Sequence, residues 1–274
     1  QRRRRAARTK RLTEGETMVG LSAEGQRVVV TAGAAGIGRA IVEALVSAGA
    51  RVHICDVDAR TLAACGQNLG VGTTLADVSD EAQVDRLFDE AASALGGLDV
   101  LVNNAGIAGP TGAVEEIAPA EWRRCIDIDL TGQFLCARRA VPLLKQNAQG
   151  AIINMSSAAG RHGYAYRTPY SAAKWGVIGF TQSLAKELGP SGIAVNAILP
   201  GIVKGPRIEG VIRARASQLN LTYAEMEAQY LEKVSLRRMV TAEDVAQMVL
   251  FLASPLGRNI SGQSIGVCGN VETL

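Results

Sequence analysis

The feature of this sequence that most constrains its fold is a regular alternation of short β-branched apolar runs with helical stretches. Strands that read as nearly continuous apolar runs are typical of a parallel sheet covered on both faces, where helices connect successive strands. The alternation therefore predicts a doubly wound α/β fold. The expected strands occupy residues 27–31, 51–55, 72–76, 98–102, 151–155, 193–198 and 264–267.

Between these strands, apolar residues recur at three- and four-residue spacing, as expected of amphipathic helices. An Asx-type cap near Ser79 or Asp80 is expected to begin the third helix, and the fourth helix is expected to bend. The predicted helices occupy residues 36–48, 58–69, 80–95, 119–145, 169–188 and 242–253.

Residues 205–240 interrupt this alternation because they are rich in Arg, Glu and Gln, with Tyr223, Met226 and Tyr230 at helical spacing. We expect a helical lid over the substrate, with a pair of solvated surface helices as the alternative. The predicted organisation is a basic, flexible tail at residues 1–20 and one catalytic domain at residues 21–274, with the lid inside it.

The basic charge of the chain is concentrated at its start. Residues 1–17 carry a net charge of +5, which leaves −2 for the rest of a chain whose total is +3. A solvated tail explains this cluster better than a nucleic-acid surface, because the domain itself is not basic. The tail lacks the apolar stretch of a secretory signal, and Met18 suggests that residues 1–17 precede the natural start. We expect neither nucleic acid nor a membrane as a partner.

The cysteines and histidines argue against stabilisation by disulfides or metal. The five cysteines form no Cys-x-x-Cys pair and have no spacing typical of a disulfide framework, so reduced thiols and a cytoplasmic location are expected. Neither of the two histidines, His53 and His162, has a second ligand-type residue at metal-site spacing. We expect no bound metal.

A glycine-rich turn follows the first expected strand, where residues 32–38 read Ala-Gly-Ala-Ala-Gly-Ile-Gly. Small residues here let the backbone approach a pyrophosphate, whose charge is met by the free amides at the start of the next helix. Asp56 ends the second strand and could accept hydrogen bonds from a ribose while repelling a 2′-phosphate, although Asp56 by itself could also be a turn former. The pattern favours NAD over NADP. The expected cofactor contacts are Gly33, Gly36, Ile37, Gly38 and Asp56.

Tyr170 and Lys174 are four residues apart on an expected helix, so they share one face. Tyrosine normally titrates near pH ~10 and is a poor base at neutrality. Lowering its pKa to about 7 takes roughly 4 kcal/mol, and an ammonium group about 4 Å away supplies that much at an effective dielectric constant near 20. Tyr-x-x-x-Lys alone is common on helix surfaces, but together with the glycine turn it indicates a catalytic pair that needs no metal.

In combination, these motifs resemble those of the short-chain dehydrogenase/reductase family, and the resemblance extends from about residue 21 to the end of the chain. It implies a single Rossmann-like domain with a seven-stranded parallel sheet, assembled as a homotetramer through long helices. It also implies hydride transfer between a nicotinamide cofactor and a carbonyl or alcohol. The matching segments are residues 31–38, Asp77-Val78, Asn103-Asn104-Ala105-Gly106, Ser157, Tyr170-Ser171-Ala172-Ala173-Lys174 and Pro200-Gly201.

The same resemblance implies a role for each matching residue. Tyr170 is expected to be the general acid/base and Ser157 to hold the substrate oxygen, while Lys174 lowers the pKa of Tyr170 and holds the nicotinamide ribose. The remaining cofactor contacts implied by the resemblance are Asp77 and Val78 at the adenine, Asn104 in the cofactor cleft, and the backbone of Val203 at the carboxamide.

Four positions depart from the family pattern, and one of them affects the chemistry. Asp129 stands where the family has the asparagine that holds a relay water near the lysine. An ionised Asp129 close to Lys174 would partly neutralise the ammonium and raise the pKa of Tyr170, which predicts an optimum displaced to alkaline pH. The alternative is that Asp129 faces a backbone amide away from the relay. The other three departures are Ala32 for a turn glycine, Gly205 for a threonine and Cys268 for an aspartate.

The predicted function is oxidation of a secondary alcohol, because NAD-linked enzymes usually run in the oxidising direction. Tyr164 and Tyr166 are expected to line the substrate pocket with Ser157 and Tyr170, and Tyr223, Met226 and Tyr230 are expected to add apolar surface from the lid. Such a pocket suits a hydrophobic ketone, a cyclic alcohol or an aryl alcohol better than a charged sugar acid.

A regulator or pseudoenzyme that binds the dinucleotide with little turnover is the alternative function. The departures at Ala32, Asp129 and Gly205 favour it. The intact Ser157, Tyr170 and Lys174 argue against it.

Overall fold

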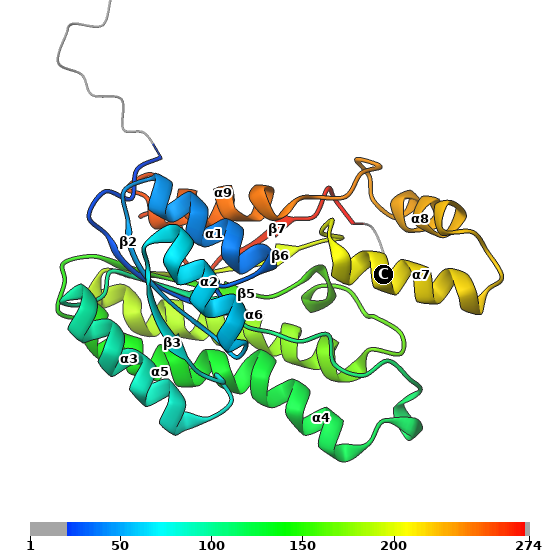
Figure 1. Cartoon of the computed structure of the whole chain (residues 1–274), viewed down its shortest axis with the longest axis horizontal. Coiled ribbons are helices and arrows are strands. Elements are labelled where there is room, and N and C mark those ends of the chain that lie inside the picture. The colour runs from blue at the N-terminus through cyan, green and yellow to red at the C-terminus, as the bar shows by residue number, and fades with distance from the viewer. Residues whose placement is uncertain (1–20, 272–274) are drawn as a thin grey trace, which may run out of the picture.

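Seven parallel strands form one twisted sheet at the centre of the molecule in a computed structural model that describes residues 21–271 (Figure 1). The strand order is β3-β2-β1-β4-β5-β6-β7, so the predicted doubly wound α/β fold is confirmed. The strands are β1 (Arg27–Thr31), β2 (Arg51–Asp56), β3 (Gly72–Leu75), β4 (Val100–Asn103), β5 (Gly150–Met155), β6 (Ile193–Pro200) and β7 (Ser264–Val267). The predicted tail at residues 1–20 lies outside the described residues.

Helices cover both faces of the sheet (Figure 1). Helices α1, α2 and α9 pack on one face over a core that contains Ile41, Leu62 and Val249, and α3, α5 and α6 pack on the other around Phe88 and Leu188. The helices are α1 (Gly36–Ser47), α2 (Ala59–Leu69), α3 (Glu81–Leu95), α4 (Pro119–Ile126), α5 (Gly132–Leu144), α6 (Thr168–Leu188), α7 (Pro206–Gln218), α8 (Tyr223–Glu232) and α9 (Ala242–Ala253).

Local sequence signals explain where several of these helices begin and end. Asp80 caps α3 by accepting a hydrogen bond from the amide of Gln83 at 3.1 Å, and Gly96 ends that helix with a left-handed backbone. Thr241 caps α9 in the same way through the amide of Asp244. The predicted cap near residue 80 is therefore confirmed.

The sheet reverses its winding between β1 and β4, which are neighbours although two strands separate them in the chain. Ligands of doubly wound folds bind beyond the carboxyl ends of the strands at such a reversal. The strand ends here carry the glycine turn after β1 and the segments after β4 and β5. The topology therefore brings three sequence motifs to one edge of the sheet.

Helices α7 and α8 extend away from the sheet as a separate hairpin of helices (Figure 1). They form a small core of their own, built on Ile212, Ala216 and Met226. An isolated β-bridge between Val203 and Val240 joins the two ends of the segment that contains α7 and α8. Within residues 21–271, no helix is both long and apolar enough to cross a membrane.

Candidate active site

The glycine turn after β1 is shaped to let another molecule approach the start of α1. Gly36 has a left-handed backbone with φ +54°, and a Cβ at this residue would meet nothing within 4 Å. A Cβ at Gly38 would lie 2.0 Å from the carbonyl oxygen of Ala32, so only glycine fits there. The N-cap residue of α1, Ala35, provides no side-chain cap, which leaves first-turn amides available to an anion. These residues fit a dinucleotide diphosphate.

Asn104, at the end of β4, holds the same turn from the neighbouring strand. Its side-chain amide donates to the carbonyl oxygens of Thr31 and Ala32, both at 3.0 Å. The Thr31 hydroxyl in turn accepts from the amides of Asn104 and Ala105, each at 3.0 Å. Asn104 thus fixes the turn itself, and its predicted contact with the cofactor cleft is compatible with this position.

Asp56 ends β2 beside the turn, as expected of a ribose-binding carboxylate. One of its oxygens accepts from the amide of Ala34 at 3.2 Å, and the other accepts from the amide of Val57 at 2.8 Å. The carboxylate therefore lies against the glycine turn. Like charge at this position disfavours a 2′-phosphate.

The residues predicted at the adenine lie after β3. The Asp77 carboxylate accepts from the amide and the hydroxyl of Ser79 at 2.9 and 2.7 Å, and it lies 3.8 Å from Arg124. Val78 is buried and packs where Gly132 begins α5. The structure describes these positions, and their adenine contacts stay a prediction.

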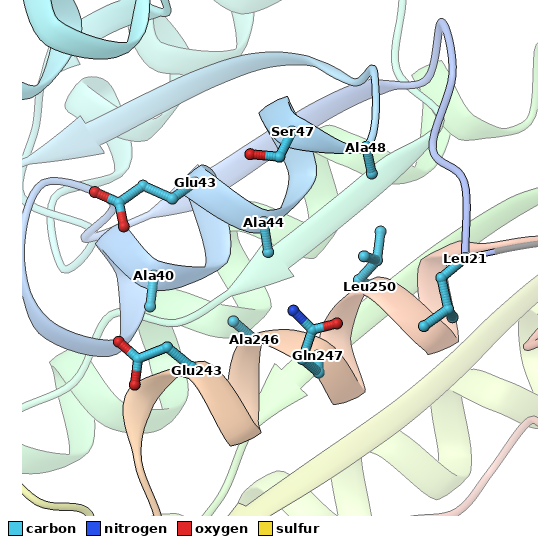
Figure 2. Close-up of a pocket in the computed structure, with 10 residues that line it drawn as sticks. All are labelled: Leu21, Ala40, Glu43, Ala44, Ser47, Ala48, Glu243, Ala246, Gln247 and Leu250. Atoms are coloured by element: carbon cyan, nitrogen blue, oxygen red, sulfur yellow. The ribbon is translucent and has the colours of Figure 1, made fainter.

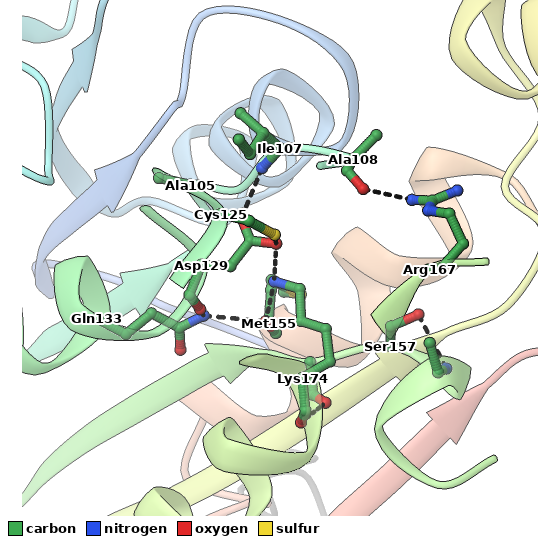
Figure 3. Close-up of polar contacts among 12 residues, drawn as sticks. Ala105, Ile107, Ala108, Cys125, Asp129, Gln133, Met155, Ser157, Arg167 and Lys174 are labelled. Carbon is green, nitrogen blue, oxygen red and sulfur yellow. Dashed lines mark hydrogen bonds and ion pairs between the residues drawn. The ribbon is translucent and has the colours of Figure 1, made fainter. Parts of the chain in front are cut away.

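Helix α6 carries Tyr170 in its first turn and is tied to the segment that follows β5. The Ser171 hydroxyl donates to the carbonyl of Ala159 at 3.0 Å, and the Ser156 hydroxyl donates to the carbonyl of Lys174 at 2.7 Å. Ser157 lies between these ties, and its hydroxyl accepts from the amide of Ala159 at 3.2 Å (Figure 3). Ser157 and the start of α6 are thereby held at the same strand end.

Lys174 is 3% exposed, and its ammonium group projects from α6 towards the ends of β4 and β5 (Figure 3). It donates to the carbonyl of Met155 at 3.1 Å and lies 5.6 Å from the centroid of the Tyr170 ring. It also lies 3.8 Å from a carboxylate oxygen of Asp129. Lys174 is therefore a buried cation shared between a carboxylate and the aromatic ring of Tyr170.

Asp129 reaches this position because the long helix predicted at residues 119–145 is interrupted. Residues Asp127–Thr131 form a π-helical turn between α4 and α5, a local widening that is frequent at functional sites. The side chain of Gln133 braces the turn by donating to the carbonyls of Asp129 at 3.2 Å and Met155 at 3.0 Å. The predicted bend is present as this π-helical turn.

The Asp129 carboxylate is fully buried and has two kinds of partner. One oxygen accepts from the amide of Ile107 at 2.6 Å, and the other faces Lys174 and the Cys125 thiol, which lies 4.0 Å away. Burial raises the pKa of Asp129 above its ordinary value, and the charge of Lys174 opposes that rise. Asp129 faces a backbone amide, as the alternative interpretation expected, but it also lies 3.8 Å from the lysine, so the expectation that it lies away from the relay is wrong.

Arg167 is a site residue that the sequence analysis missed. It is 8% exposed, and its guanidinium lies 4.9 Å from the centroid of the Tyr170 ring and 5.2 Å from that of Tyr164. It donates to the carbonyl of Ala108 at 2.5 Å (Figure 3). Its position three residues before Tyr170 was visible in the sequence, but its burial depends on the loop after β4, which is distant in the chain.

The other side chains predicted to line the substrate pocket differ in their surroundings. Tyr164 lies against Arg167, and the pKa of Tyr230 is raised by burial and by the nearby Tyr164, which places α8 beside this loop. Tyr166 is 56% exposed with a left-handed backbone, and its carbonyl accepts from the amide of Gly112 at 3.0 Å. Its predicted substrate contact stays untested. Met226 is buried in the α7–α8 core, so it packs these two helices together instead of lining a pocket.

The segment that leads into α7 contains a predicted cofactor contact, Val203, and a departure from the family pattern, Gly205. Val203 is half-buried and bridges to Val240, and its carboxamide contact stays a prediction. Gly205, in place of the family's threonine, has φ +151° and caps α7. A β-branched residue would be strained in that conformation.

Two surface hollows lie outside the proposed catalytic residues. The larger, about 430 Å³, is a groove between α1 and α9 lined by residues such as Glu43, Ala246 and Leu250 (Figure 2). The smaller, about 320 Å³, lies behind the Ser157 segment between His162 and Cys268. In the described part of the chain, no group of three or more His, Cys, Asp or Glu side chains is placed to hold a metal ion.

Several known proteins are similar to this chain over most of its length. Residues 32–270 match the family model described as enoyl-(acyl carrier protein) reductase. The chain is 40% identical over 253 residues to cis-4-hydroxycyclohexanecarboxylate dehydrogenase of Sinomonas cyclohexanicum, covering 90% of this chain and 96% of that protein. It is 35% identical over 231 residues to the NAD(+)-dependent 2-dehydro-3-deoxy-L-rhamnonate dehydrogenase of Sphingomonas sp. (strain SKA58), covering 84% and 88%. The crystal structure of levodione reductase superimposes with a TM-score of 0.85 at 30% identity, covering 90% and 97%.

Proposed function

The chain belongs to the short-chain dehydrogenase/reductase family, and on that premise we propose that it oxidises a secondary alcohol with a cyclic or otherwise apolar body through Ser157, Tyr170 and Lys174. It is an NAD-dependent oxidoreductase that acts on CH–OH groups. The single observation that supports these residue roles best is their convergence. A serine, a tyrosine and a buried lysine meet at one strand end beside a glycine turn that fits a diphosphate.

The proposed residues divide the work of the reaction as follows. When bound, NAD supplies the acceptor for the hydride that leaves the alcohol carbon. The Ser157 hydroxyl binds the substrate oxygen, and the Tyr170 oxygen takes the proton from the substrate hydroxyl as the carbonyl forms. The positive charge of the Lys174 ammonium stabilises negative charge on Tyr170. Lys174 is buried, so little water screens this attraction.

The cofactor would be held along the strand ends. The glycine turn and the first-turn amides of α1 would bind the diphosphate, and Asp56 would bind the adenosine ribose. Asp77 and Val78 would lie at the adenine, Lys174 at the nicotinamide ribose, and the backbone of Val203 at the carboxamide.

The experiment that tests this function is a screen of secondary alcohols in which NADH absorbance is measured. We expect oxidation of cyclic alcohols by the parent, and a loss of at least about a thousandfold in Tyr170→Phe, because the proton acceptor is gone. Tyr223→Phe is the matched control, since it keeps the apolar ring and removes only a hydroxyl that donates to Glu227 at 3.3 Å. Unchanged activity in Tyr170→Phe would refute the assignment.

The regulator hypothesis is tested by the same screen combined with NAD titration. Saturable NAD binding without turnover of any alcohol would favour it. We favour the enzyme, because Lys174 is buried beside the ring of Tyr170, where its charge serves proton transfer in addition to binding the dinucleotide.

The assembly we propose is a homotetramer formed through helices α4, α5 and α6. Large apolar side chains are exposed on these helices, namely Trp122, Phe134 and Trp175 at 39%, 48% and 51%. Burial of such residues against a second copy would remove apolar surface from water. We also propose a reducing compartment, the cytoplasm, because all five cysteines are free thiols and four of them are buried.

A further inference from the structure

Arg167 is a buried cation without an anionic partner. Its side chain is enclosed by the rings of Tyr164 and Tyr170, and the residue is 8% exposed. Within residues 21–271, no carboxylate forms an ion pair with it, and its buried Nε has no hydrogen-bond partner. In the described part of the chain, its guanidinium donates to the carbonyl of Ala108.

Such an arrangement is costly for a protein. Arginine is almost never fully buried unless it is paired, because a desolvated charge loses its hydration. The guanidinium has five N–H donors, and the Ala108 carbonyl satisfies one of them. The two tyrosine rings offset part of the cost through cation–π contacts. The charge of Arg167 also acts on Asp129, but no carboxylate among the described residues lies within ion-pair distance of the guanidinium.

The substrate is the natural source of an anion that pairs directly with Arg167, because Arg167 contacts the ring of the proposed catalytic tyrosine. We propose that Arg167 binds a carboxylate on the substrate, so that the alcohol this enzyme oxidises is a hydroxy acid. This inference rests on the proposed function. It deepens the substrate class expected from the sequence by adding a negative charge to the cyclic or apolar body.

The charges around the site support an anionic substrate. Lys174 pairs directly with Asp129, whereas Arg167 acts on Asp129 only through longer-range charge and has no direct ion pair among the described residues. Arg207, exposed in the first turn of α7, is close enough for its charge to act on Asp129 and adds a second cation from the lid. A guanidinium and a carboxylate carry equal and opposite charge and can pair through two parallel hydrogen bonds.

The position of Arg167 also limits the shape of the substrate. Ser157 and Tyr170 would hold the reacting hydroxyl, and the Arg167 guanidinium lies 4.9 Å from the centroid of the Tyr170 ring. The carboxylate and the hydroxyl must therefore be separated by a short spacer of a few carbon atoms. A six-membered ring meets this requirement, and the aromatic side chains of Tyr164 and Tyr230 provide surface for it.

The test compares one substrate with and without its charge. The kcat and KM of the parent are measured for 4-hydroxycyclohexanecarboxylate and for its methyl ester. We expect kcat/KM to favour the acid by about tenfold or more, as a charge-assisted hydrogen bond predicts. In Arg167→Gln, the KM for the acid should rise by about tenfold to a hundredfold while the KM for the ester changes little. Arg167→Lys should retain part of the preference.

Controls separate substrate binding from a bracing role. Arg161→Gln is the matched variant, because Arg161 lies on the same loop but donates to the carbonyl of Ser264 on β7, and it should keep the parent's acid preference. Arg207→Gln provides a second variant should Arg167→Gln fail to fold. We expect it to raise the KM for the acid by a smaller factor. Equal losses with acid and ester in Arg167→Gln would show that the guanidinium only braces Tyr170, and would overturn the proposal.

A binding measurement keeps the inference separate from the proposed catalysis. Calorimetric titration of the NAD-loaded protein with cyclohexanecarboxylate and with cyclohexanecarboxamide needs no turnover. We expect the carboxylate to bind more tightly than the amide in the parent and to lose that advantage in Arg167→Gln. Equal binding of the two, or of the carboxylate to parent and variant, would overturn the proposal even if secondary alcohols are oxidised. Preferential carboxylate binding without oxidation would refute the proposed function alone.

Discussion

Single residues in this protein carry conformational and electrostatic costs that are visible in the structure. Ala32 replaces a turn glycine and has a left-handed backbone with φ +49°. A side chain there costs about 1–2 kcal/mol, partly offset by the extra freedom that glycine has when unfolded. Ala32→Gly is therefore expected to stabilise the fold by about 0.5–1 kcal/mol. Urea unfolding of both proteins checks this, and a less stable variant would contradict it.

Asp129 is expected to affect how the reaction rate depends on pH. Burial raises the pKa of its carboxyl, so the charge develops only above the ordinary range of an aspartate. Once ionised, 3.8 Å from the Lys174 ammonium, it cancels part of the positive field that favours proton loss from Tyr170. In Asp129→Asn, the rising limb of the pH–rate profile is expected to move to lower pH. Superimposable profiles for parent and variant would reject this role.

Among the elements, the carboxyl end of β2 determines cofactor choice. Asp56 is held there by amides of the glycine turn and of its own strand end. Removing the carboxylate abolishes its hydrogen bonds to a ribose and its repulsion of a 2′-phosphate. In Asp56→Ser, the ratio of kcat/KM for NAD to that for NADP is expected to fall by about tenfold or more. Asp58→Ser is the control, because Asp58 caps α2 and faces Thr61.

The pairing of β2 with β3 encloses a group that responds to acid. His53 is 3% exposed, with one ring nitrogen 2.9 Å from the Thr74 hydroxyl and the other without a partner in the described residues. Burial lowers the pKa of His53, so the unfolded chain binds a proton more readily than the folded one, and stability falls as pH drops below about 6.5.

His53→Gln removes this titration while keeping a polar group near Thr74. The loss of unfolding free energy between pH 7 and pH 5 is expected to be smaller in the variant, by up to about 1.4 kcal/mol per unit of pKa difference. Chemical denaturation at the two pH values measures it. The same loss in both proteins would show that His53 does not titrate on unfolding.

For the whole molecule, the exposed aromatic residues of α4, α5 and α6 should determine assembly. Phe134 is 48% exposed on α5, and a charge placed there would be buried without a partner at a contact between copies. Phe134→Glu is expected to convert a tetramer into smaller species with little loss of fold. Sedimentation velocity resolves this, with exposed Leu256→Glu as a control from outside these helices. A parent that sediments as a monomer would end the assembly proposal.

The order and kind of the helices and strands, the glycine turn and the family could all be predicted from the amino-acid sequence. These features depend on local periodicity, caps and turn chemistry, which are written in neighbouring residues: β1 was predicted at its observed bounds, and Asp80 caps α3 as expected. The tertiary structure decided how Asp129 meets Lys174 and how Arg167 is buried. Both depend on contacts between segments that are distant in the chain. The loop after β4 contacts the π-helical turn through Ile107 and Asp129, and it contacts the start of α6 through Ala108 and Arg167. No local pattern encodes such contacts, because burial and pairing are set by which strand ends the topology brings together.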